Sequence, residues 1–327
     1  TEEQAFSSIE YIMRDVDYGW VIRYMHTTGA SLFFAVVYLH MFRGLLYGSY
    51  QKPKELVWIF GCTIYLAMMA EGFLGYVLPY GQMSYWGAQV IISLFGAIPY
   101  VGESLELWVR GDYYISGITV SRFFALHVVA LPLILIALVF LHLVALHEVG
   151  AGNPEGVDIE EHLDEDGVPL DSVPFYPYKV LNGLVAIGVF MTVFAIIMFF
   201  FPEGGGYFIE MANFQEANPL VTPDHIAPVW YYAPFYTMLR AIPDPLGGLI
   251  VMAAAVAIFF IVPWLDRSKV ASIRYKGIYS KIAITLFGVS FLTLGYLGTV
   301  GVTEIRKIMS IICTIIYFAY FLLMPIY

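Results

Sequence analysis

The sequence has little charge for its length. Of its 327 residues, 13% are Asp, Glu, Lys or Arg, whereas 60% are hydrophobic and 17% are aromatic. A water-soluble domain carries roughly 25% charged residues, so this chain cannot cover a water-facing surface, and a soluble enzyme is excluded. The net charge of −10 excludes nucleic acid as a partner, because phosphate binding needs basic patches. What remains is an integral membrane protein.

Cysteine is also scarce. Cys62 and Cys313 both lie in apolar runs, and their spacing excludes a zinc site, an iron–sulfur cluster and covalent haem attachment. We expect both to be buried apolar side chains. No signal peptide is visible, and the first residue is Thr1, so we expect either a processed chain or a sequence that begins late.

Long apolar runs are what the sequence does contain. A helix spans a bilayer with about 20 apolar residues. Seven runs of this kind predict an all-α, polytopic bundle of transmembrane helices. They are 18–47, 56–80, 116–147, 181–202, 245–265, 277–298 and 304–326.

The loops between these runs alternate between two faces. Three loops share the face that is richer in Lys and Arg: 48–55, 148–180 and 266–276. An excess of Lys and Arg marks the cytoplasmic side, and acidic residues count for little. We therefore place these loops in the cytoplasm and interpret the acidic run Asp158–Asp166 as solvated. The long aromatic loops 81–115 and 203–244 lie on the outer face, where we predict interfacial helices.

Four of the seven histidines lie inside two of the predicted spanning helices: His26, His40, His127 and His142. A histidine in a membrane helix is costly unless it is paired or bound as a ligand. The interval from His26 to His40 is about 40° short of four turns, with a rise of about 21 Å. The interval from His127 to His142 is one residue longer, about 60° past four turns, with a rise of about 22 Å. Each helix thus presents both its histidines on one face.

One spanning helix separates these two helices in the chain, so they run parallel. His26 then lies level with His127 near the outer face, and His40 lies level with His142 near the inner face. Such cross-helix pairs suit six-coordinate haem iron. Two haems about 20 Å apart would conduct electrons across the membrane. A lipid-soluble quinone would donate and accept these electrons. The alternative is four unrelated histidines bonded to polar neighbours, which the matched depths disfavour.

Neighbouring residues support a haem site. Gly29 follows His26 closely and would let a macrocycle approach. Arg23, Arg43 and Arg122 lie near the helix ends, at the level of haem propionates, and arginine pairs well with carboxylates. Each arginine could instead anchor its helix at the membrane interface.

Seven stretches, from about residue 5 to the C-terminus, resemble one known family. They are DYGWVIRYMHTTGAS and YLHMFRGLLYGSY around His26 and His40, GYVLPYGQMSYWGA at 75–88, AIPYVG at 97–102, SRFFALH at 121–127, LHLVALHEVGAGNP at 141–154 and NPLVTPDHIAPVWY at 218–231. Together they resemble cytochrome b, the membrane subunit of quinol–cytochrome c reductase, in its bacterial form.

The resemblance implies two non-covalent b haems. His26 and His127 would hold the outer, lower-potential haem, and His40 and His142 the inner, higher-potential haem. It also implies three regions: a haem-bearing part at 1–150 (helices B to D of the family), a cytoplasmic loop at 151–180, and a C-terminal part at 181–327 (helices E to H). The family's first helix, expected just before Thr1, would be missing or separate.

The resemblance further implies an activity. Quinol would be oxidised at an outer site, and electrons would cross the two haems to reduce quinone at an inner site, with coupled proton translocation. The partners would be a Rieske-type iron–sulfur subunit and a cytochrome c-type subunit, in a homodimeric complex within the lipid of a bacterial plasma membrane.

The quinone sites are also carried over from the family. The outer, quinol-oxidising site would contain Pro228, Trp230, Tyr231 and Tyr100. The inner, quinone-reducing site would contain His147 and Asn182.

Both quinone sites depart from the family pattern. The family's Pro-Glu-Trp-Tyr motif has Val229 in place of the glutamate, and a valine cannot accept a proton. We expect water, Tyr231, Tyr100 or Glu103 to take that role. His225 lies close to this pocket, and we interpret it, like His162, as a solvated loop residue.

At the inner site the family often has Lys-Asp where this chain has Asn182-Gly183, and a serine where it has Ala151. Lys179, Glu148 and Asn182 are candidate substitutes for proton delivery.

Three other functions remain open. A di-haem membrane anchor of a quinone-linked dehydrogenase would share the histidine pairs but would lack the PVWY segment and the long outer loops. A proton-coupled transporter would bind no haem and would need broken helices or inverted repeats. A subunit that has lost its redox role would bind haem without oxidising quinol.

Overall fold

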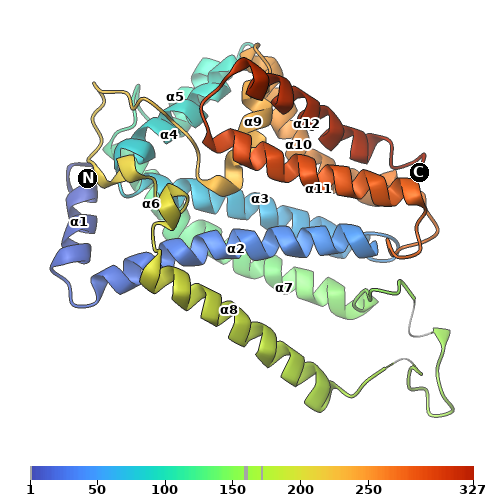
Figure 1. Cartoon of the computed structure of the whole chain (residues 1–327). Coiled ribbons are helices and arrows are strands. Elements are labelled where there is room, and N and C mark those ends of the chain that lie inside the picture. The colour runs from blue at the N-terminus through green and yellow to red at the C-terminus, as the bar shows by residue number, and fades with distance from the viewer. Residues whose placement is uncertain (1, 158–160, 171) are drawn as a thin grey trace.

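The computed structural model describes residues 2–157, 161–170 and 172–327. In these ranges seven helices are long and apolar enough to span a membrane, and they lie side by side as a bundle (Figure 1). They are α2 (Gly19–Tyr47), α3 (Glu55–Val77), the continuous helix of α6 (Gly117–Ala125), η2 (Leu126–Ala130) and α7 (Leu131–Val149), the helix of η4 (Phe175–Lys179) and α8 (Val180–Phe200), α10 (Pro245–Leu265), α11 (Ile278–Thr299) and α12 (Glu304–Leu322). The predicted all-α bundle is confirmed.

Prolines set two helix ends that differ from the predicted ones. α3 ends at Val77, before Pro79, and α12 ends at Leu322, before Pro325. Proline has no backbone N–H group, so Pro79 and Pro325 cannot donate the hydrogen bond that would continue either helix. The apolar character of the sequence continues past both helix ends. Hydrophobicity alone therefore predicted each helix to end three or four residues further along the chain than it does.

The three predicted cytoplasmic loops meet at one end of the bundle. The Gln51 side-chain amide donates a hydrogen bond to Asp266 Oδ2 at 2.9 Å, and the Ser272 hydroxyl donates to the Pro154 carbonyl at 2.5 Å. The chain ends at the same side of the bundle (Figure 1). The predicted alternation of loops is therefore present. Part of the acidic run Asp158–Asp166 lies outside the described residues, and its residues from 161 onward are exposed.

Short helices gather at the opposite end (Figure 1). The loop 81–115 contains α4 (Gln82–Ser93), η1 (Leu94–Ala97) and α5 (Gly102–Arg110), which are the expected interfacial pieces. The N-terminal helix α1 (Glu2–Arg14) was not expected, because it is too polar to register as an apolar run, and it buries none of its residues. The loop 203–244 forms η5 (Gly204–Gly206), η6 (Met211–Phe214), η7 (Trp230–Tyr232) and α9 (Ala233–Ala241).

α9 belongs to the core and does not lie on the surface. Its buried residues include Phe235 and Met238, and it packs against α10, α11 and α12. The main hydrophobic cluster joins these helices to α2 and α3 through large buried side chains such as Tyr65, Tyr317 and Phe321. The two halves of the chain therefore share one core.

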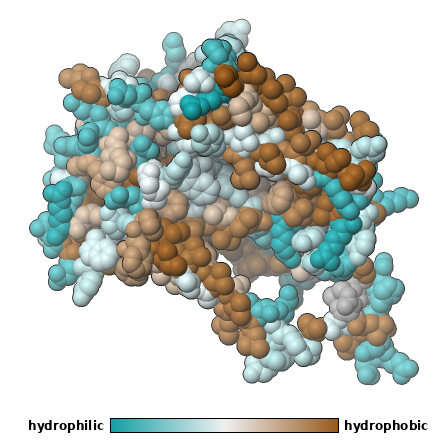
Figure 2. Space-filling model, viewed as in Figure 1, coloured by the Kyte–Doolittle hydropathy of each residue, from teal (hydrophilic) through white to brown (hydrophobic). Residues whose placement is uncertain are grey.

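The helix of α7 and the helix of α8 are much less covered by protein. In the most apolar stretch of each, only 6% of residues are buried. α8 diverges from the bundle at its N-terminal end (Figure 1), and hydrophobic side chains cover its surface (Figure 2). Lipid tails are as apolar as leucine, so these helices have a lipid-facing surface.

Candidate functional site

Two histidine pairs lie between α2 and the helix of η2 and α7. The ring centres of His26 and His127 are 6.2 Å apart, with planes inclined by 71°. Those of His40 and His142 are 6.4 Å apart, with planes inclined by 74°. The structure thus brings together the partners that helix periodicity predicted, and it gives both pairs almost the same geometry.

The spacing of each pair fits one metal ion between two imidazoles. A metal–imidazole bond of about 2.0 Å, plus roughly 1.2 Å from that nitrogen to the ring centre, places two ring centres about 6.4 Å apart. Among the described residues no group of three or more His, Cys, Asp or Glu side chains could hold a metal. Two protein ligands per ion match haem, whose porphyrin supplies the other four.

A π-helical turn explains why the interval from His127 to His142 can be longer by one residue than the interval from His26 to His40. His127 lies in this turn, η2 (Leu126–Ala130). Pro132 lacks an N–H group and its ring crowds the carbonyl of Val128, and a wider turn relieves that clash. A π turn takes one more residue than an α turn. The extra residue is absorbed there, so His142 is not rotated away from His40 as a regular helix would require.

Two glycines of α3 make room for the histidine rings. A Cβ atom on Gly75 would lie 2.4 Å from Cε1 of His127, and a Cβ atom on Gly61 would lie 3.3 Å from Cε1 of His142. Gly29, the glycine selected from the sequence, faces a looser space, because its Cβ would meet only Phe194 at 3.8 Å. The sequence did contain a signal for this pair, because Gly61 and Gly75 are separated by the same interval as the two α2 histidines.

Each histidine pair borders a cavity that also contains an arginine. The inner cavity, of about 280 Å³, is lined by His40, His142 and Arg43. The outer cavity, of about 70 Å³, is lined by His26, His127 and Arg23, among others. Both arginines could therefore meet a propionate.

Arg122 lies elsewhere. Its Nη1 donates a hydrogen bond to the Trp108 carbonyl at 2.9 Å, beside α5. Its side chain is exposed and does not line the outer cavity.

The segment 228–231 packs against α2, the helix that carries His26 and His40. The Tyr231 ring stacks on Phe34 of α2, with ring centres 3.9 Å apart, and Trp230 Nε1 donates a hydrogen bond to Ser31 Oγ at 3.3 Å. Tyr231 also lines the outer histidine cavity. Aromatic packing therefore joins the C-terminal half of the chain to the outer histidine pair.

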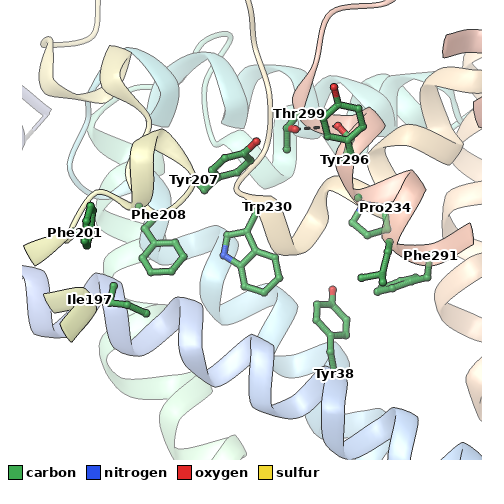
Figure 3. A pocket seen from close by; sticks show the side chains of 13 residues that line it. Tyr38, Ile197, Phe201, Tyr207, Phe208, Trp230, Pro234, Phe291, Tyr296 and Thr299 are labelled. Carbon is green, nitrogen blue, oxygen red and sulfur yellow. Dashed lines mark hydrogen bonds between the residues drawn. The ribbon is translucent and has the colours of Figure 1, made fainter. Parts of the chain in front are cut away.

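A large apolar cavity lies beside this segment. Its volume is about 500 Å³, within the range of small-molecule sites. Figure 3 shows aromatic rings from α2, α11 and the loop 203–244 surrounding it. The lining residues are Tyr38, Ile197, Phe201, Gly204, Tyr207, Phe208, Trp230, Pro234, Phe291, Leu292, Gly295, Tyr296 and Thr299.

A second, more polar cavity is also lined by Trp230. It has a volume of about 240 Å³, and Glu210, His225, Pro228 and Val229 all line it. Burial raises the pKa of the Glu210 carboxyl, and the nearby His225 imidazole partly opposes that rise. Sequence reasoning missed Glu210, because nothing in its local pattern connects it to the segment 228–231 further along the chain. His225 is exposed, as predicted, yet it borders this cavity.

Four residues proposed from the sequence stand apart from these cavities. Tyr100 is fully exposed in the turn before α5, and it lines neither cavity beside the segment 228–231. Glu103, at the start of α5, is exposed as well. His147 at the end of α7 and Asn182 at the start of α8 are both exposed, and neither lines the inner histidine cavity.

Fold and site together define a class: a polytopic helical membrane protein with two stacked histidine pairs shared by two parallel helices. Comparison with known proteins identifies the family. The family model "Cytochrome b/b6/petB" matches residues 1–150, and "Cytochrome b(C-terminal)/b6/petD" matches residues 216–318. The chain belongs to the cytochrome b family.

Individual relatives agree with this assignment. The chain is 57% identical to "Cytochrome b" of Allochromatium vinosum, over 99% of this chain and 80% of that protein. It is 47% identical to "Cytochrome b" of Rhodospirillum rubrum, over 98% of this chain and 76% of that protein. Its fold matches a chain of a "Hyperthermophilic respiratory Complex III" with a TM-score of 0.92 and 36% identity, covering 100% of this chain and 83% of the other.

Proposed function

We propose that this chain is the di-haem membrane subunit of a quinol–cytochrome c reductase. The observation that carries the proposal is the geometry of the two histidine pairs, whose ring centres lie 6.2 and 6.4 Å apart. In this proposal quinol is oxidised at the outer site and quinone is reduced at the inner site, with coupled proton translocation.

The residues present fit two b haems. His26 and His127 would hold the outer haem and His40 and His142 the inner one, while Gly75 and Gly61 leave space for the imidazoles. Bound haem would supply reversible one-electron chemistry. The protein's part is to fix both rings of each pair and to keep the sites out of water.

The outer quinol site has two chemical environments. The apolar cavity of about 500 Å³ suits a quinone ring and its apolar tail, with Trp230 at the boundary to the polar cavity. Val229 cannot accept a proton, but Glu210 and His225 line that polar cavity. We propose that these two side chains accept the protons of quinol and pass them to the outer water.

The inner quinone site is proposed next to the inner histidine pair. Arg43 and Lys54 line the inner cavity and give it a positive lining. His147 and Asn182 remain proposed contacts for quinone, at the cytoplasmic ends of α7 and α8.

The complex III relative supports a multi-subunit assembly. We propose a Rieske-type iron–sulfur subunit and a cytochrome c-type subunit as partners, and a homodimeric complex. Bacterial relatives and the basic loops together favour a plasma membrane with loops 48–55, 148–180 and 266–276 in the cytoplasm.

An optical redox titration of the purified complex tests this function. Two b-haem steps are expected, with His127→Ala losing one and His40→Ala losing the other. His162→Ala, in an exposed loop, should keep both. A single step, or none, in the unmodified complex would overturn the proposal. Two steps without quinol–cytochrome c reductase activity would favour the dehydrogenase anchor instead.

A further inference from the structure

The outer histidine ligand has a carboxylate partner. His127 Nδ1 lies 3.0 Å from Oε1 of Glu71 and 3.0 Å from the Glu71 backbone carbonyl. A backbone carbonyl can only accept, so Nδ1 carries the proton and donates it to this carbonyl, with the Glu71 carboxylate beside it. This arrangement leaves Nε2 free of a proton, as an iron ligand requires.

The inner histidine ligand lacks such a partner. Val57 precedes Glu71 on α3 by the same interval that separates Gly61 from Gly75. It therefore occupies, beside the inner histidine pair, the place that Glu71 occupies beside the outer pair. Its backbone carbonyl lies near the His142 ring, but the buried His142 Nδ1 makes no well-formed hydrogen bond within the described residues. The Val57 side chain is apolar and can add none. The outer and inner histidine pairs therefore have the same α3 backbone beside them, and they differ in that only the outer pair has a carboxylate, that of Glu71.

Burying the Glu71 side chain at this position costs stability. It lies inside a spanning helix, and its second oxygen, Oε2, is buried with no hydrogen-bond partner among the described residues. A buried acceptor without a partner destabilises the fold, and more so when it is charged. The contact with the His127 ring would give the carboxylate a function that explains its place there.

We infer that Glu71 is a positioning residue that lowers the reduction potential of the outer haem relative to the inner one. This inference rests on the proposed function. A carboxylate on the far nitrogen of a metal-bound imidazole makes it a more basic ligand. A more basic ligand and a nearby negative charge both favour ferric over ferrous iron. The difference between Glu71 and Val57 thus directs electrons from the outer haem to the inner one.

The test is a potentiometric titration of the whole complex carrying Glu71→Gln. One of the two haem steps should move to higher potential. At a fixed potential its ratio of reduced to oxidised haem should rise about ten-fold, which is about 59 mV for one electron. The other step should not move. Glu71→Ala keeps the backbone acceptor and should shift the same step in the same direction.

Glu55→Gln is the matched control, because it removes a carboxylate from the first turn of the same helix and Glu55 lines neither histidine cavity. It should leave both steps in place. Two unchanged steps in Glu71→Gln would overturn the inference while leaving the proposed function intact. Loss of one haem from both Glu71 variants would also overturn it, since Glu71 would then retain haem without tuning it. Absence of haem from the unmodified complex would instead refute the proposed function.

Discussion

Tyr231 and Phe34 form a face-to-face stack, with ring centres 3.9 Å apart and planes only 5° apart. Phe34 lies on α2, midway between the histidines of that helix, whereas Tyr231 ends the segment 228–231 of the C-terminal half. Both side chains are buried, at 3% and 4% exposure. The stack therefore fixes one wall of the outer histidine cavity to α2, the helix that supplies one histidine of each pair.

Removing the Tyr231 ring should loosen that wall. Tyr231→Ala is expected to lose the stacking energy of about 0.5–1.5 kcal/mol, in addition to its packing, and to lower the rate of quinol oxidation. Tyr231→Phe keeps the ring and should retain most of the rate. Quinol–cytochrome c reductase assays with both variants, alongside thermal unfolding in detergent, measure these effects. Equal rates for the Ala and Phe variants would show that the stack has no part in the outer site.

The space at Gly75 should be essential for the outer haem. The Cβ of Gly75→Ala would lie 2.4 Å from His127 Cε1, so the imidazole must move. We expect the haem content to fall from about two per chain toward one, with the outer redox step lost. Gly188→Ala on α8 is the control, since its Cβ would meet nothing within 4 Å. Haem extraction and redox titration give the answer, and full haem content in Gly75→Ala would contradict the fit.

Glu210 should give quinol oxidation a pH dependence. The carboxylate must be ionised to accept a proton, and burial raises its pKa, with His225 partly opposing that rise. The rate should therefore increase as the pH rises through this raised pKa. Glu210→Gln should lose that increase and slow turnover by about a hundred-fold or more.

The control for this prediction is Glu216→Gln, an exposed carboxylate of the same loop. It should keep both the rate and the pH profile. If the profiles of Glu210→Gln and the unmodified complex coincide, quinol protons leave by another route.

The cytoplasmic end should depend on Asp266. Its Oδ2 accepts hydrogen bonds from Lys276 Nζ at 2.6 Å and from the Tyr50 hydroxyl at 2.7 Å. Burial alone would raise the pKa of Asp266, but these bonds outweigh it and lower the pKa. Because the folded pKa lies below the unfolded one, this stability is present above the unfolded value, about 3.9. It is lost as the pH falls through the folded value.

Asp266→Asn leaves the Lys276 ammonium without its partner and should cost about 3–5 kcal/mol. The comparison is Arg274→Gln, which breaks an exposed ion pair with Glu155 at the same end and should cost under about 1 kcal/mol. Thermal unfolding of both variants in detergent, repeated at falling pH, separates the two. Similar losses for the two variants would refute the special role of Asp266.

Helix positions and histidine pairing could be predicted from the sequence because both depend on local periodicity. About 20 apolar residues define a span, and the interval between His26 and His40, close to a whole number of turns, defines a face. The α9 helix was harder, because its burial depends on helices that follow it in the chain. Its Phe235 and Met238 look like interfacial residues until α10, α11 and α12 pack around them.

The chemistry around the sites depended on contacts between distant segments. Glu210 meets the polar cavity only because the loop 203–230 folds back over α4, where Gln82 pairs with Gln215 through a backbone hydrogen bond of 2.9 Å. The Glu71–His127 contact joins two helices that are far apart in the chain. Tyr100 is the opposite case, since the family pattern predicts a pocket residue and the side chain is exposed in this structure.

The π turn at 126–130 separates two quantities that are usually treated as one, the number of residues between two ligands and the distance between them. An insertion in a regular helix would turn every later side chain by about 100°. Here the wider turn confines that rotation of side chains to a few residues beside Pro132. The helix on either side can then keep its own contacts with α3, and the two histidines of this helix stay level with those of α2 although one more residue separates them.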